Sequence, residues 1–257
     1  MTDRQALLQN IDSYLDAAPR TACDVERLGP FTLFFRRDSA MLELSYARPA
    51  VPLPTLEAED IDQIRAAFAK RGRTCRWEFL ADLVPQFPEL LVQHGFPPPI
   101  PRPLMVVTKE TFRPERSVIA DIRPIRREET RAVGRVLFEA FGAPIDADYE
   151  SEPDMLASIL ERGASVYAAF VDGKPVAAGS HAPVGETTEV AGVGTLADFR
   201  GRGLAGALTS ALVEDAFGRG CACVFLSAAD ETVQRVYARV GFAKIGVAMD
   251  TADSVGA

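Results

Sequence analysis

TLADFRGRGLAG, residues 195–206, is the stretch of sequence that decides the fold of this chain. It lies between an apolar run typical of a strand and an apolar pattern typical of a helix. The turn between them is rich in glycine and arginine. Such a turn directs several backbone N–H groups and the positive end of a helix toward one point. The sequence therefore predicts a site for a phosphate or pyrophosphate group at this turn.

Spacing distinguishes this turn from two other phosphate-binding turns. A P-loop requires Gly-x-x-x-x-Gly-Lys-Ser/Thr, and residues 195–206 contain no lysine. A dinucleotide-binding turn follows the first strand of its fold and has an acidic residue about 20 positions further on. Arg200-Gly201-Arg202-Gly203 comes late in the chain instead. Neither of these two nucleotide-binding folds is therefore expected.

The composition is that of a protein with a sizeable core. Of the 257 residues, 47% are hydrophobic and 25% are charged, which suits one large domain or two small ones. The formal net charge is −8. This charge argues against a general nucleic-acid binder, because a phosphate backbone requires a basic surface. It is compatible with a cationic or amine substrate.

Neither export nor membrane insertion is indicated. The apolar runs are too short for a membrane-spanning helix, and residues 1–5 lack the basic-then-apolar pattern of a secretory signal. Cys221 and Cys223 would point to the same face of one strand, where disulfide geometry is poor. His94 and His181 do not have metal-ligand spacing to the cysteines. We therefore expect a cytoplasmic protein with buried thiols and no metal.

Residues 114–257 form a C-terminal region in which strands and helices alternate. Asp172-Gly173-Lys174 is a hairpin signal between two of the strands. We expect strands over 118–123, 164–171, 175–182, 188–196, 222–227 and 243–249, and helices around 133–141, 155–161, 204–212 and 233–240. This order predicts an α/β fold with a mixed sheet, in which antiparallel hairpins precede a βαβ crossover.

Residues 1–113 form an N-terminal region with a related pattern. The Leu91–Phe96 segment resembles Tyr237–Phe242, because each is a helix end followed by Gly-Phe. A diverged internal duplication is therefore predicted. We expect the proline-rich run 97–103 to form neither a helix nor a central strand. The other expected elements are strands over 31–35, 41–46 and 75–80 and helices around 61–68 and 88–94.

Two motifs in the C-terminal region resemble the GNAT superfamily of acyl-CoA-dependent N-acyltransferases. The first is Arg200-x-x-Gly203-x-Ala205, which matches the family signature Gln/Arg-x-x-Gly-x-Gly/Ala after the fourth strand. The second matches an Asn-x-x-Ala-x-x-x-Tyr-like pattern that ends in Gly-Phe, and its residues here are Asp230, Val233, Tyr237, Gly241 and Phe242. The resemblance covers roughly residues 118–249. It implies a mixed-sheet GNAT fold, acetyl-CoA as the donor and an amine as the acceptor.

The resemblance also implies that the C-terminal lobe is catalytic and that the N-terminal lobe is a degenerate GNAT-like copy. Arg71-Gly72-Arg73 follows the expected N-terminal helix rather than preceding it. Leu91 stands at the position that corresponds to Tyr237. One cofactor site is therefore expected rather than two, and the N-terminal lobe would complete the acceptor cleft.

The cofactor contacts are assigned by the resemblance residue by residue. Backbone groups of Val193, Gly194 and Thr195 would pair with the pantetheine arm, and Arg200 would add charge. Asp230 stands where the family usually has asparagine, and it also suits the N-cap of the following helix. The residues that would present N–H groups to the pyrophosphate are Gly201, Arg202, Gly203, Leu204, Ala205 and Gly206.

Two residues are candidates for proton transfer. Tyr237 stands where the family places the tyrosine that protonates the CoA sulfur, although it also fits a core aromatic on the apolar face of its helix. Glu189, eleven residues before Arg200, stands where the histone-acetyltransferase branch places its general base. An exposed hairpin glutamate is the alternative for Glu189.

The predicted function is direct transfer of an acetyl group from acetyl-CoA to a primary amine of a small molecule or peptide. An acyl-CoA-binding regulatory module without turnover is the alternative, and a protein whose N-terminal lobe binds a partner is a third. The acidic residues between Asp146 and Asp154 would attract a basic acceptor, unless they form only a solvated loop. No nucleic acid or membrane partner is expected. The oligomeric state stays open, and a monomer with two pseudo-dimeric lobes fits the duplication.

Overall fold

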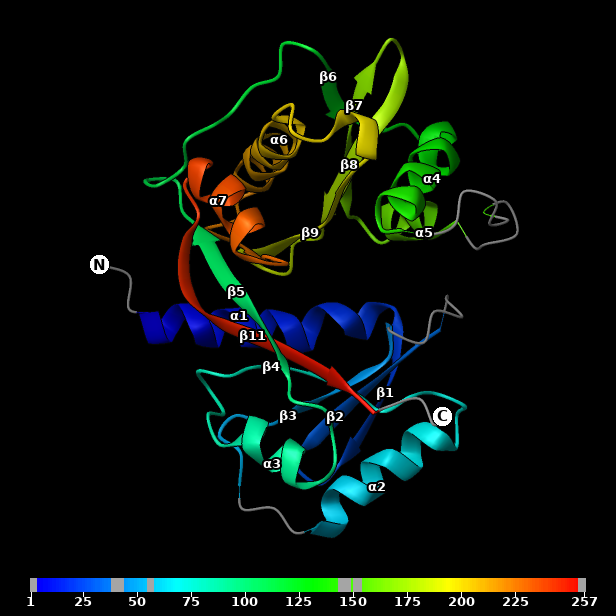
Figure 1. The fold of residues 1–257 in the computed structure, drawn as a ribbon, viewed down its shortest axis with the longest axis vertical. Helices are drawn as coiled ribbons and strands as arrows, with labels where there is room; N and C mark the ends of the chain where they lie inside the picture. Colours follow the sequence, from blue (N-terminus) through cyan, green and yellow to red (C-terminus); the bar gives the residue numbers. More distant parts are fainter. Residues whose placement is uncertain (1–3, 38–43, 55–57, 143–148, 150–153, 254–257) are drawn as a thin grey trace. The chain divides into compact units, whose positions relative to one another are not determined.

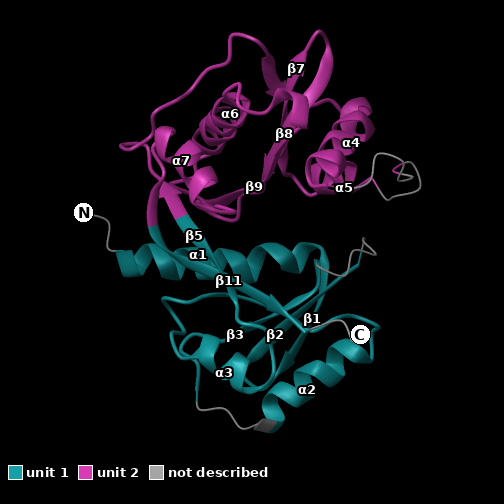
Figure 2. Ribbon diagram, in the orientation of Figure 1, with its two compact units in different colours: residues 1–104, 245–257 teal, residues 105–244 magenta. Residues whose placement is uncertain are grey.

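The computed structural model describes residues 4–37, 44–54, 58–142, 149 and 154–253 (Figure 1). The chain forms two compact units (Figure 2), of which unit 1 comprises residues 1–104 and 245–257 and unit 2 comprises residues 105–244. It passes from unit 1 to unit 2 inside β5 (Ile100–Val107) and returns inside β11 (Ala243–Ala252). From the sequence we expect the two regions to meet between residues 113 and 114. In the structure, residues 105–113 belong to unit 2 and residues 245–257 belong to unit 1.

Unit 2 is built on a mixed sheet of the order β5-β10-β9-β8-β7-β6. Its strands are β6 (Asp121–Pro124), β7 (Ser165–Val171), β8 (Lys174–His181), β9 (Thr187–Thr195) and β10 (Cys223–Ser227). The pair β9–β10 is parallel, and β9–β8, β8–β7 and β7–β6 are antiparallel. The helices are α4 (Thr130–Ala140), α5 (Met155–Glu161), α6 (Leu204–Gly218) and α7 (Glu231–Arg239). The expected mixed α/β order is confirmed.

Apolar side chains on both faces of this sheet explain its position between two helical layers. In β7, Val166, Ala168 and Phe170 join a core with residues of α4 and α5. Ala169, in the same strand, joins the larger core that includes residues of α6 and α7. Side chains alternate between the faces of a strand, so a strand covered on both faces is apolar almost throughout.

The strands of unit 1 follow the order β1-β2-β3-β4-β11. Its own elements are α1 (Arg4–Ala17), β1 (Cys23–Leu28), β2 (Phe31–Arg36), β3 (Tyr46–Pro49), α2 (Ala58–Ala69), β4 (Arg76–Leu80) and α3 (Phe87–Gln93). The pair β3–β4 is parallel, and β1–β2, β2–β3 and β4–β11 are antiparallel. The core contains Phe31, Trp77 and Phe87, whose side chains are fully buried.

One order of elements occurs twice along the chain. It is β1-β2-β3-α2-β4-α3-β5 in the first copy and β7-β8-β9-α6-β10-α7-β11 in the second. Helices α3 and α7 also end with equivalent backbone hydrogen bonds. Phe96 N–H donates to Leu91 O at 3.0 Å after α3, and Phe242 N–H donates to Tyr237 O at 3.1 Å after α7. This bond belongs to the glycine-terminated helix end. The repeated order and the matching helix ends agree with the internal duplication that the Gly-Phe repeat predicts.

Four expectations need correction. The strand expected at 118–123 begins only at Asp121, and Val118 is 99% exposed. Strand β3 begins at Tyr46, and residues 41–43 of the strand expected over 41–46 lie outside the described residues. Helix α1 and strand β1 were not predicted. Strand β5 runs through the proline-rich segment, because its prolines occupy the more exposed half before Leu104.

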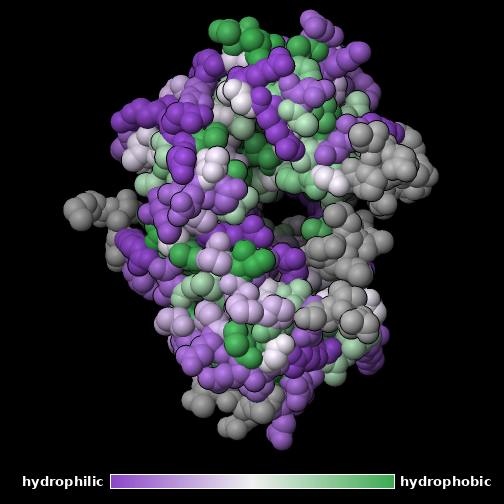
Figure 3. Space-filling model, viewed as in Figure 1, coloured by the Kyte–Doolittle hydropathy of each residue, from purple (hydrophilic) through white to green (hydrophobic). Residues whose placement is uncertain are grey.

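The expected state of the cysteines is confirmed, since all four are free and buried. Among the described residues, the helices are too short or too polar to cross a membrane. On the face shown in Figure 3, apolar residues form small separate groups among hydrophilic ones.

Candidate functional site

The N-terminus of α6 has no side chain that caps its backbone donors. Its N-cap is Gly203, which has φ +78° and provides no side-chain cap. Gly201 also has a positive φ, +73°, so the turn requires glycine at both positions. Helices α5 and α7 begin differently, because the carboxylates of Asp154 and Asp230 accept a hydrogen bond from their first turns. An external anion can therefore bind at α6, whereas side chains already cap α5 and α7.

A cavity of about 350 Å³ lies at this helix end. Its walls combine the turn with two residues of α7, Val236 and Arg239. Of the predicted cofactor residues, Val193, Gly194, Arg202 and Asp230 do not line the cavity, and Arg202 lies over the Phe199 ring. The cavity is lined by Thr195, Phe199, Arg200, Gly201, Gly203, Leu204, Ala205, Gly206, Val236 and Arg239.

The guanidinium of Arg200 holds the turn in place. Its Nε donates to Thr195 O at 3.1 Å, and its Nη2 donates to Ala140 O at 3.0 Å. These bonds join the end of β9 to the end of α4 and orient the turn between β9 and α6. Arg200 therefore has a structural role at the cavity, and a part of its hydrogen-bonding capacity is already used.

Strands β9 and β10 separate after Glu189, and β9 runs on toward the cavity. Their register pairs Thr187–Glu189 with Cys223–Phe225, and β9 then continues along β8 alone to Thr195. A register shift opposite Ala178–Ser180 includes Gly192, which has φ +62°. Leu196 N–H donates to Val176 O of β8 at 2.9 Å, so the backbone groups of Leu196 face β8. Because these groups alternate in direction along a strand, those of Val193 and Thr195 point away from β8. An extended ligand could add to this free edge as a strand does.

Gly194 provides the close contact between this edge and α4. A Cβ at this position would lie 3.0 Å from Ala140 Cβ and 3.1 Å from Leu137 Cδ2. Only glycine lets the helix approach the strand so closely without displacement.

The two proton-transfer candidates lie in different places in unit 2. Glu189 is half-buried and forms the last β9–β10 pair with Phe225, where the strands separate. Tyr237 is 8% exposed and belongs to the core on the α6 and α7 face. Burial raises the pKa of Tyr237, so its phenol is protonated at neutral pH. Both interpretations of Tyr237, as a core aromatic and as an acid, are compatible with this position.

The segment before β6 packs against the base of the cavity. Glu115 N–H donates to Ser210 Oγ at 2.9 Å, and the Glu115 carboxylate accepts from Arg239 Nε at 2.9 Å. A Cβ on Gly206 would lie 1.9 Å from Glu115 Oε2, so glycine is required there for this contact. Gly241 has the same role, because a Cβ there would lie 2.0 Å from Thr111 O.

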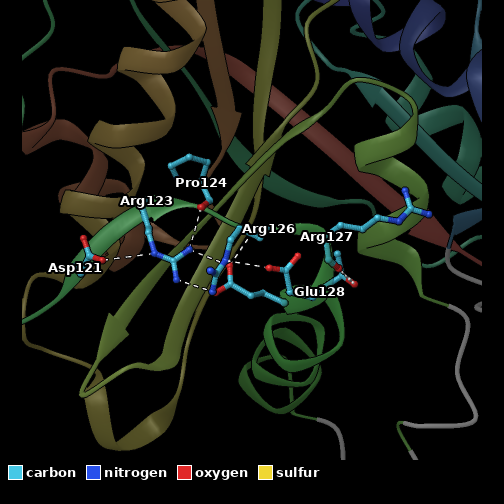
Figure 4. Close-up of polar contacts among 8 residues, drawn as sticks. Asp121, Arg123, Pro124, Arg126, Arg127 and Glu128 are labelled. Atoms are coloured by element: carbon cyan, nitrogen blue, oxygen red, sulfur yellow. Dashed lines mark hydrogen bonds and ion pairs between the residues drawn. The ribbon is translucent and has the colours of Figure 1, made fainter.

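A cluster of charged side chains fixes the other end of α4 (Figure 4). The Glu129 carboxylate accepts two hydrogen bonds from Arg123, at 2.9 and 2.8 Å, and one from Arg126 Nη2 at 2.8 Å. These donors hold the pKa of Glu129 far below its usual range. They tie the start of α4 to β6, while Arg200 ties its last residue to β9.

A polar network on the α6 face was not predicted from the sequence. Buried His181 hydrogen-bonds through Nε2 to Asp215 Oδ2 at 2.8 Å and through Nδ1 to Thr188 Oγ1 at 3.3 Å. Ser165 and Tyr167 also donate to the Asp215 carboxylate. An ionised carboxylate only accepts, so the proton of a neutral His181 lies on Nε2. Asp215 thus joins α6 to β7 and β8, and its residues are too far apart in sequence for spacing to reveal them.

The described residues contain no group of three His, Cys, Asp or Glu side chains that could hold a metal ion. Of the acidic segment between Asp146 and Asp154, residues 146–148 and 150–153 lie outside the described residues. Asp154 itself caps α5 and accepts from Thr130 Oγ1 at 2.7 Å.

Comparison with known proteins identifies this architecture. A sequence model described as "Acetyltransferase (GNAT) family" matches residues 124–242. A GCN5-related N-acetyltransferase from Kribbella flavida is 24% identical with a TM-score of 0.78, over 97% of this chain and 96% of that chain. One from Sphaerobacter thermophilus is 18% identical with a TM-score of 0.63, over 89% and 82%.

A two-lobed relative is also similar. A tandem GNAT protein from the clavulanic acid biosynthesis pathway is 12% identical with a TM-score of 0.57, over 88% of this chain and 79% of that chain. No curated protein matches the sequence. Residues 124–242 thus match the GNAT acetyltransferase family, and the chain shares its fold with these solved structures.

Proposed function

We propose that this protein transfers an acetyl group from acetyl-CoA directly to a primary amine of a small molecule or peptide. One observation carries the proposal: the uncapped N-terminus of α6 and the free edge of β9 meet at one cavity. An anion-binding helix end beside an unpaired strand edge suits a ligand with a phosphate group and an extended amide-containing arm. CoA has both.

The residues that would hold CoA divide between the two features. Backbone N–H groups from Gly201 to Gly206 would bind the pyrophosphate, and those of Val193 and Thr195 would pair with the pantetheine amides, while the backbone of Gly194 faces β8. When bound, acetyl-CoA supplies a thioester that an amine can attack without a covalent acyl-enzyme. We assign no direct contact to Asp230, because its carboxylate caps α7 at Val233 N, 2.8 Å away.

Proton transfer is assigned to Tyr237 and Glu189. Tyr237 is protonated at neutral pH and hydrogen-bonds to none of the described residues, so its O–H is available to a leaving thiolate. Glu189 lies where β9 and β10 separate, and a carboxylate there would accept the amine proton, directly or through water. Both roles would be filled by residues of unit 2.

A screen of amines for acetyl-CoA-dependent thiol release tests the proposal, combined with calorimetric titration of CoA. Turnover with at least one primary amine, together with CoA binding, supports acetyl transfer. CoA binding without turnover on any amine favours the regulatory module. Absence of CoA binding by the folded protein contradicts both.

A further inference from the structure

Arg239 is the basic side chain best placed to bind an anion in the cavity at the start of α6. Three arginines lie at or near the cavity: Arg200, Arg202 and Arg239. Arg200 donates to two backbone carbonyls, and Arg202 lies over Phe199 without lining the cavity. Arg239 is the remaining one, and it reaches the cavity from α7.

Glu115 holds the guanidinium of Arg239 at one edge. The Glu115 backbone is fixed by its bond to Ser210 Oγ, which itself donates to Gly206 O at 2.9 Å. The carboxylate accepts only from Nε, at 2.9 Å. The Nη1 and Nη2 groups of Arg239 have no partner among the described residues, and the side chain is 56% exposed. This leaves a fixed pair of donors beside the α6 N-terminus.

We propose that Arg239 is a phosphate ligand of the CoA site, held in place by Glu115. This deepens the proposed function and rests on it. The terminal N–H groups of a guanidinium match two oxygens of a phosphate, and their charge adds to that of the helix end. CoA offers this chemistry twice, in its pyrophosphate and in the 3′-phosphate of its adenosine.

Arg239→Gln tests the proposal in calorimetric titrations with CoA and with dephospho-CoA. We expect the Kd of CoA to rise about tenfold, as for loss of one charge-assisted hydrogen bond. An equal rise for dephospho-CoA identifies the pyrophosphate, and a rise for CoA alone identifies the 3′-phosphate. Arg239→Lys should give a smaller rise, because an ammonium keeps the charge without the paired donors.

Arg235→Gln is the matched control. Arg235 lies one turn earlier on α7, is exposed and lines a separate cavity with Glu231 and Gln234. The control removes the same charge from the same helix and should leave both Kd values unchanged. The melting temperature of Arg239→Gln should stay close to that of the wild type, because an exposed ion pair adds little stability.

Two results would overturn the inference. If Arg239→Gln binds both ligands as the wild type does, Arg239 serves only as a partner of Glu115 at the end of α7. If Arg235→Gln weakens binding as much as Arg239→Gln, the effect is one of net charge. A wild-type protein that binds neither ligand contradicts the proposed function itself.

Discussion

Glu189 and Phe225 form the last register pair shared by β9 and β10, at the point where these parallel strands separate. Beyond this pair the free edge of β9 leads toward the turn at the start of α6. A carboxylate at such a position can meet an amine that approaches a ligand held along the strand edge.

For Glu189→Gln, we expect kcat/KM to fall and the acidic limb of the pH–rate profile to disappear. Gln has a similar shape but cannot accept a proton from the amine. The measurement is initial rate against pH, with the best amine from the screen. An acidic limb that stays at the same pH would exclude Glu189 as the base.

Tyr237→Phe should leave CoA affinity unchanged and lower kcat by roughly 10- to 100-fold, since general acids contribute on this scale or above. The phenyl ring keeps the contact with Phe242, 6.0 Å away between ring centroids. Titration of CoA and steady-state kinetics separate the two effects. If the kcat of the variant equals that of the wild type, Tyr237 is a core aromatic only.

Gly203→Asp should weaken CoA binding by about tenfold or more, because a carboxylate at the N-cap takes up helix donors and repels the phosphates. The control is Gly220→Asp, just after α6. Gly220 also has a positive φ, +90°, and a Cβ added there would meet no atom within 4 Å. The control carries the same strain and charge, so calorimetric Kd values that rise equally would contradict a phosphate site at Gly203.

Gly241→Ala should destabilise the protein by about 3 kcal/mol or more, because backbone strain is added to severe overpacking. The Cβ would meet Thr111 O at 2.0 Å. Gly185→Ala is the control, with φ +58° and open space around the Cβ, and should cost only about 1–2 kcal/mol. Urea unfolding of both variants measures the difference. Equal losses would mean that strain alone requires glycine at position 241.

The His181–Asp215 network predicts a loss of stability on acidification. Burial lowers the pKa of His181 below 6.5, so the unfolded chain binds a proton that the folded protein excludes. Stability should therefore fall as the pH decreases from 6.5 toward the folded pKa. Asp215 adds a second loss below pH 3.8, because hydrogen bonds from Ser165, His181 and Tyr167 outweigh burial and lower its pKa.

His181→Gln provides the comparison for this pH dependence. Urea unfolding free energies measured between pH 7 and pH 5 should show a smaller slope for the variant than for the wild type. Equal slopes would assign the acid sensitivity to other groups.

Local patterns predicted much of unit 2 from the sequence. Helix α5 occupies the predicted residues 155–161, because a short apolar repeat ends at Arg162-Gly163. The hairpin at Asp172-Gly173 is also confirmed, and both residues have the positive φ that this turn requires. Such features depend on neighbours a few residues away.

Other features could not be predicted because they depend on distant residues. Glu115 and Arg239 are 124 positions apart, and no spacing rule connects them. Arg200 matched the family motif, but the motif did not reveal that its guanidinium binds two carbonyls. Helix α1 was missed although Leu8, Ile11 and Tyr14 recur at a spacing of three and are buried. For this helix the periodic signal was present in the sequence.

The return of the chain in β11 has a consequence for synthesis. Ribosomes deliver residues in order, and Ala248–Ala252 pair with Leu80–Arg76 of β4 in unit 1. Unit 1 therefore lacks the strand that pairs with β4 until residues 105–244 have emerged. The N-terminal lobe starts first and is completed last, so a fragment that ends at residue 113 would expose the unpaired edge of β4 to aggregation.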